Sequence, residues 1–173
     1  MVHRVVIAVL LIAASARAED RFGRRGQVVP FGSVSFQHFG GSGFDSNAIA
    51  ILPGALWFAA DNFAIGGSVG YRRAWGGPFG SVDALSISPE AGIAIPLGDR
   101  AAFFPRFGLE SLTVWNGGTS SFFAIRAFAP VLFFAAPHFY IGFGPDFLVT
   151  AAGPGGSSGT WNAGAMSEIG GYF

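Results

Sequence analysis

The chain has 173 residues, of which 51% are hydrophobic and only 12% are charged, with ten basic and ten acidic side chains. This charged fraction is about half of that in ordinary soluble domains, and a balanced charge gives no reason to expect a nucleic-acid partner. The chain has no cysteine, which excludes disulfides and thiolate metal sites, and we expect no cofactor.

Residues 1–18 are expected to be a secretory signal peptide. Residues 1–4 carry positive charge, residues 5–14 are apolar, and Ala16-Arg17-Ala18 has the small-x-small form of a cleavage site. A membrane anchor is the alternative, but about a dozen apolar residues fall short of the roughly 20 that a spanning helix needs. Because cleavage removes two arginines, the remaining chain would carry a net charge of about −2.

Residues 19–26 (EDRFGRRG) are expected to form a flexible, solvated lead-in, and residues 27–173 a single domain of β-strands. Over this second range, large apolar residues alternate with small or polar ones, which is the period of a strand. The expected strands are 27–39, 47–59, 63–73, 82–95, 101–115, 121–134, 139–150 and 161–173.

Short breaks at 60–62, 97–100 and 136–138 recur about every 37 or 38 residues. The connections between them are longer and rich in glycine and serine. A repeat of this length also occurs in β-propellers, but each propeller blade needs four strands and more repeats are required. Eight strands that alternate between short turns and longer loops favour a closed antiparallel up-and-down barrel.

Residues 127–145 carry no formal charge and are long enough for a spanning helix. However, Pro130 and Pro137 lie inside this stretch, and a proline in a helix interior costs about 3 kcal/mol. The alternation of Phe139, Ile141 and Phe143 with smaller residues also favours a strand.

The large apolar residues share one face of each strand. An eight-stranded barrel encloses a lumen just wide enough for side chains to fill, so alternating phenylalanine and isoleucine from several strands would overfill it. We therefore expect the apolar face to point outward into lipid. The residues expected to face lipid include Phe103, Phe107, Phe123, Phe133, Phe143 and Phe147.

Charged residues fall on the opposite, inward face of the expected strands. Counted from the short turns, one group lies about 10 to 12 residues up its strands and a second group about 8 residues up. Opposite charges in one narrow lumen favour pairing, so we expect a charge network that plugs the barrel. Its expected members are Arg72, Glu90, Arg106, Glu110, Arg126, Asp146 and Glu168.

Three features together resemble the small eight-stranded outer-membrane β-barrel proteins of Gram-negative bacteria. They are the signal peptide, the Pro-x-x-x-aromatic-Phe-x-x-Asp-Asn hairpin from Pro53 to Asn62, and the terminal Gly171-Tyr172-Phe173. The resemblance implies an outer-membrane location with both termini in the periplasm. It also implies that Tyr172 and Phe173 form the signal read by the barrel-assembly machinery during insertion.

A family of this kind shares a fold more than a function. His38, Ser42 and Asp45 are the residue types of a hydrolytic triad, but no spacing holds a base against a nucleophile, so we expect no catalytic or metal site. Two classes of function remain. The first is a non-catalytic barrel that is structural, adhesive or partner-binding through its external loops. The second is passage of a small or apolar solute, or modification of lipid A.

Overall fold

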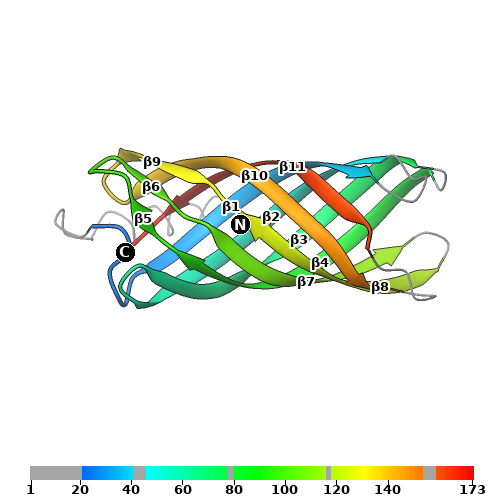
Figure 1. Cartoon of the computed structure of the whole chain (residues 1–173), viewed down its shortest axis with the longest axis horizontal. Helices are drawn as coiled ribbons and strands as arrows, with labels where there is room; N and C mark the ends of the chain where they lie inside the picture. The colour runs from blue at the N-terminus through cyan, green and yellow to red at the C-terminus, as the bar shows by residue number, and fades with distance from the viewer. Residues whose placement is uncertain (1–20, 41–45, 78–79, 116–117, 154–158) are drawn as a thin grey trace, which may run out of the picture.

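The computed structural model describes residues 21–40, 46–77, 80–115, 118–153 and 159–173. Figure 1 shows strands that run obliquely around one closed barrel. The strands are β1 (Val28–Gly40), β2 (Ser46–Ala60), β3 (Phe63–Gly77), β4 (Gly80–Ile93), β5 (Ile95–Pro96), β6 (Ala101–Phe103), β7 (Arg106–Trp115), β8 (Thr119–Phe128), β9 (Val131–Ala136), β10 (Phe139–Ala152) and β11 (Trp161–Gly171).

These eleven segments form eight continuous runs, because β5 continues β4, β7 continues β6 and β9 continues β8. Two of the three breaks contain a proline, Pro105 or Pro130, which has no N–H to donate to the ladder. Pairing nevertheless crosses the breaks: Phe104 N donates to Pro130 O at 2.9 Å, and Ile93 N donates to Pro105 O at 3.1 Å.

The runs pair antiparallel with their neighbours in the chain, and β11 pairs with both β10 and β1. The ring therefore has no free edge among the described strands, which confirms the expected eight-stranded antiparallel barrel. No helix among the described residues is long and apolar enough to cross a membrane.

The tight turns gather at one end of the barrel. Asn62 and His138 adopt left-handed backbone conformations there, with φ of 62° and 61°, and Gly98 has φ of 105°. The start of β1 and the end of β11 lie at the same end (Figure 1). We call it the terminal end, and the opposite end the loop end.

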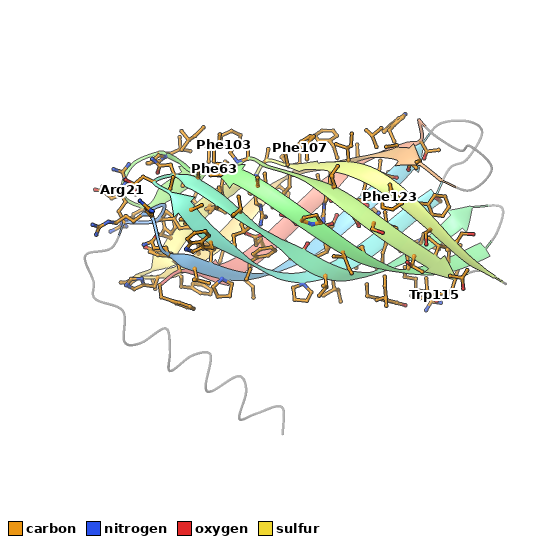
Figure 2. The ribbon with its side chains drawn as sticks, turned by 90° about the horizontal axis from the view of Figure 1, so that it is seen from below. Arg21, Phe63, Phe103, Phe107, Trp115 and Phe123 are labelled. Atoms are coloured by element: carbon orange, nitrogen blue, oxygen red, sulfur yellow. The ribbon has the colours of Figure 1, made fainter. Side chains whose placement is uncertain are left out.

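Side chains alternate across the barrel wall over most of each strand. Of the six phenylalanines expected to face lipid, five are between 49% and 61% exposed on the outer surface, and Phe103 is half-buried. Figure 2 shows Phe103, Phe107 and Phe123 on the outside of the ribbon. The outward direction of these phenylalanines follows from closure of the ring, because alternate residues of a strand in a closed barrel point into the lumen and out of it.

Large aromatic side chains fill the lumen at the terminal end. We call this group the aromatic cluster; its members are Phe22, Phe58, Phe104, Phe134, Tyr140 and Tyr172. The ring of Phe22 lies at its centre. Its centroid is between 5.2 and 6.0 Å from those of the other five rings, in edge-to-face and tilted contacts. The expectation that large apolar side chains point outward therefore does not hold at this end.

Residues 21–26 fold back against the barrel mouth and are not the solvated lead-in suggested by their charge. Phe22 is only 5% exposed, and Gly23 has φ of 99°, a conformation that favours glycine. Asn62 N donates to Gly23 O at 2.6 Å, and Gly26 N donates to Phe58 O at 2.8 Å. The side-chain Oε1 of Gln27 accepts from Gly23 N at 2.9 Å.

Candidate functional site: the charged lumen

Three arginines and four carboxylates lie in the lumen beyond the aromatic cluster. They come from six strands, and each side chain in an ion pair is at most 8% exposed. The alternation of each strand accounts for their inward direction. The seven residues, which we call the lumen network, are Arg72 on β3, Glu90 on β4, Arg106 and Glu110 on β7, Arg126 on β8, Asp146 on β10 and Glu168 on β11.

The half of the lumen network nearer the loop end is a chain of alternating charges. Arg72 Nη2 donates to Glu110 Oε1 at 3.0 Å, and the other oxygen of Glu110 lies 3.9 Å from Arg126 Nη1. Arg126 donates two hydrogen bonds to Asp146, from Nε to Oδ1 at 3.0 Å and from Nη2 to Oδ2 at 3.2 Å. Such a two-donor pair is stronger and more directional than a single contact.

Asp146 also accepts two hydrogen bonds from β1, the next strand but one around the barrel. Ser35 Oγ donates to its Oδ2 at 2.6 Å, and Gln37 Nε2 donates to the same oxygen at 2.5 Å. Both donors come from β1, whereas Asp146 lies on β10, and β11 stands between these strands. These bonds therefore tie the lumen network across the seam where the barrel closes.

The half nearer the terminal end centres on Arg106. Its guanidinium contacts Glu168 through Nη2 and lies 3.7 Å from Glu90 through Nη1. Its Cζ also stands 4.7, 5.5 and 4.8 Å from the ring centroids of Phe31, Phe104 and Phe128, respectively. Cation–π attraction of this kind is strongest where the cation is desolvated.

Glu168 links this half to the aromatic cluster. Tyr140 OH donates to its Oε1 at 2.8 Å, and Ser33 Oγ donates to its Oε2 at 2.9 Å. On the other side of Arg106, Glu90 accepts from Ser68 Oγ at 2.8 Å. The lumen network and the aromatic cluster are thus hydrogen-bonded directly to each other.

The structure brings all seven expected lumen charges together. Sequence reasoning did not identify the neutral partners Ser33, Ser35, Gln37 and Tyr140. Their inward parity was visible in the sequence, but serine and glutamine on an inward face do not by themselves indicate which carboxylate they meet. Pairs across the lumen depend on the stagger of the strands, which parity does not give.

Other residues considered from the sequence lie elsewhere. His38 Nδ1 is 3.2 Å from Asn47 Oδ1 on the exposed surface, and Ser42 and Asp45 lie outside the described residues. No group of three or more potential metal ligands occurs in the described ranges. Tyr172 belongs to the aromatic cluster, while Phe173 N donates to Val28 O at 3.2 Å and Val28 N donates to Phe173 O at 2.8 Å.

In chemical terms, the lumen network is a set of mutually compensating charges. A buried ion is tolerated when it is paired and its remaining hydrogen-bonding groups are satisfied. Arg106, Arg126 and Asp146 each meet at least two polar or charged partners. This arrangement can cross-link six strands from within.

Comparison with known proteins gives a likeness of structure only. No family model matches the chain, and no curated protein matches it. Neisserial surface protein A (NspA) superposes with a TM-score of 0.71 at 11% sequence identity, over 86% of this chain and 100% of that one. Ail, the attachment invasion locus protein of Yersinia pestis, gives a TM-score of 0.55 at 13% identity, over 86% and 99% of the two chains.

A second structure of Ail from Yersinia pestis, in complex with the heparin analogue sucrose octasulfate, gives a TM-score of 0.59 at 13% identity, with 86% and 99% coverage. The whole length of these small barrels is therefore matched by this chain. At such low identity the likeness establishes the fold and not the activity. The chain has the fold of the small eight-stranded transmembrane β-barrels of Gram-negative bacteria.

Proposed function

We propose that the protein is a non-catalytic outer-membrane β-barrel with a closed lumen, which acts as a structural, adhesive or partner-binding element through its external loops. The observation that carries this proposal is the lumen network, whose charges compensate one another in two bonded groups. The aromatic cluster adds an apolar layer on the terminal side. Neither layer offers the continuous polar lining of a water-filled channel.

The proposed orientation puts both termini and the tight turns in the periplasm. Outer-membrane barrels have short periplasmic turns and longer extracellular loops, and the same asymmetry separates the terminal end from the loop end here. Binding at the external loops is the role we favour. Ail, a barrel of this fold solved with a heparin analogue, is an example of such a barrel with a bound polyanion.

Conductance of the purified protein in planar bilayers tests the closed lumen. We expect no steady single-channel current from the wild-type chain. A variant that removes both halves of one pair, Arg126→Ala with Asp146→Ala, should remain silent if the aromatic cluster closes the lumen independently. Steady currents from the wild type would refute the closed lumen and favour passage of a small solute.

The outward phenylalanines are proposed to contact lipid. Phe143 is 61% exposed and lies near the middle of β10. An arginine at mid-depth on the lipid face of such a barrel costs about 2–4 kcal/mol, so Phe143→Arg should lower the free energy of unfolding in bilayers by that amount. Phe143→Leu is the matched control. Labelling of a Phe143→Cys variant by a water-soluble thiol reagent in the inserted protein would contradict lipid contact.

Tyr172 and Phe173 are proposed to act in insertion by the barrel-assembly machinery. Because Tyr172 also packs in the aromatic cluster, the test uses Phe173, which pairs with Val28 through two backbone hydrogen bonds. Deletion of Phe173 should reduce the amount of protein in the outer membrane more than it reduces the stability of refolded protein. Equal outer-membrane levels for the deletion variant and the wild type would contradict this role.

A further inference from the structure

A cavity of about 560 Å³ occupies the lumen at the loop end. Its wall is formed by inward residues of β4, β7, β8 and β10, chiefly Val82, Ala84, Leu112, Phe122 and Leu148. Thr119, Ser120 and Thr160 line it where their strands begin. Cavities of this size, mostly apolar with a few polar groups, are typical of small-molecule sites.

Arg72 lines the same cavity and is the only charged side chain among the described residues that line it. Its side chain is 4% exposed, and one nitrogen, Nη2, donates to Glu110. Its Nε and Nη1 atoms are buried without a hydrogen-bond partner among the described residues, and so is Oδ1 of Asn162, which also lines the cavity. Buried polar atoms of this kind are costly to leave unpaired.

The other two arginines of the lumen network meet more partners than Arg72 does, although Nε and Nη1 of Arg106 are also buried without a hydrogen-bond partner among the described residues. Arg106 meets two carboxylates and three aromatic rings, and Arg126 meets two carboxylates and the sulfur of Met166. Within the described part of the chain, Arg72 meets one carboxylate. A second carboxylate at Arg72 would complete the pattern that its two counterparts already have.

We propose that this cavity binds a small amphiphile, with its carboxylate on Arg72 and its apolar tail against the wall of Ala84, Leu112 and Phe122. The ligand enters from the loop end and stops at the lumen network, so it is bound and not transported. Only the statement that the ligand is not transported rests on the closed lumen proposed above. Binding itself requires only the cavity and Arg72.

Octanoate and its uncharged isostere octanamide are suitable probes, titrated into the full protein in lipid nanodiscs, with empty nanodiscs to subtract partition into the bilayer. Hydrogen bonds to charged groups contribute about 1.5–3 kcal/mol, and each 1.4 kcal/mol is about tenfold in affinity. We therefore expect octanoate to bind at least about tenfold more tightly than octanamide. In Arg72→Met, which keeps an apolar side chain at this position, the preference should disappear.

A second variant keeps the proposal testable if Arg72→Met does not fold. Ala84→Phe fills the cavity from its wall and removes no charge from the lumen network, so both probes should lose at least about tenfold in affinity. Leu85→Phe, one residue along on the outer surface, is the matched control and should bind both as the wild type does. Equal binding of the two probes to the wild type, or unchanged binding in Ala84→Phe, would overturn the proposal.

The conductance test separates this inference from the closed lumen. A conducting barrel that prefers octanoate would refute closure and retain the binding site. A silent barrel that binds neither probe would retain closure and refute the site.

Discussion

The two ends of the lumen are built on the same strands but differ in how they are filled. At the terminal end, Phe58, Phe104 and Tyr140 point inward and meet the ring of Phe22. At the loop end, Ala74, Ala84 and similar small residues occupy inward positions, and a cavity remains. Strand number fixes the radius of the barrel, so the size of inward side chains decides whether a given level is filled or hollow.

The lumen network lies between these two levels: Glu168 accepts from Tyr140 on the terminal side, and Arg72 lines the cavity on the loop side. Arg126→Ala should produce the largest effect, lowering the free energy of unfolding by about 3–5 kcal/mol, because Asp146 and Glu110 then lose a buried countercharge. Urea unfolding in lipid bilayers measures this loss. Arg73→Ala, at an exposed outward position on the same barrel, is the control and should cost less than about 1 kcal/mol.

The geometry also identifies which second change should restore stability. Asp146 is the two-donor partner of Arg126, whereas Glu110 is 3.9 Å away and retains Arg72. Asp146→Asn should therefore recover more stability in the Arg126→Ala background than Glu110→Gln does. The reverse order would contradict the pairing described above.

Much of this organisation could be predicted from the sequence, because barrel closure leaves few options. Period-2 alternation gave the positions of the strands, and it assigned Arg126 inward and Phe123 outward. The short breaks placed Asn62 and His138 at one end. Each of these inferences needs only local pattern and the narrow lumen of eight strands.

Other features depend on contacts that no local pattern contains. Phe22 lies between charged residues in a segment without periodicity, so its burial follows only from the five rings that meet it in the lumen. The contact of Arg106 with Glu168 crosses from β7 to β11 and depends on strand stagger. The cavity at the loop end likewise depends on the sizes of inward residues on several strands, so no single residue predicts it.

The next prediction concerns the terminal end alone. Phe22→Ala removes the ring at the centre of the aromatic cluster and should cost about 3 kcal/mol, as phenylalanine truncations in packed cores do. Most of this cost should appear as release of residues 21–26, which are otherwise held by backbone bonds such as Asn62 N to Gly23 O. Trypsin cleavage after Arg24 or Arg25 should then accelerate by about a hundredfold.

Phe63→Ala is the control for this variant, since Phe63 lies near the same end but on the outer surface (Figure 2). Its trypsin cleavage should stay close to that of the wild type. Unchanged cleavage in Phe22→Ala would mean that the backbone bonds alone retain the segment.

The smallest expected effect comes from making the same change, leucine to alanine, at each end of the lumen. Leu132 is fully buried in the same apolar core as the aromatic cluster, and Leu112, 7% exposed, lines the cavity. Truncation of Leu132 to alanine opens a new void in a packed region, where the lost contacts and the void both count. Truncation of Leu112 enlarges a space that already exists, so fewer contacts are lost. Leu132→Ala should therefore cost about 1 kcal/mol more than Leu112→Ala in urea unfolding. Equal costs would mean that the two ends are packed alike.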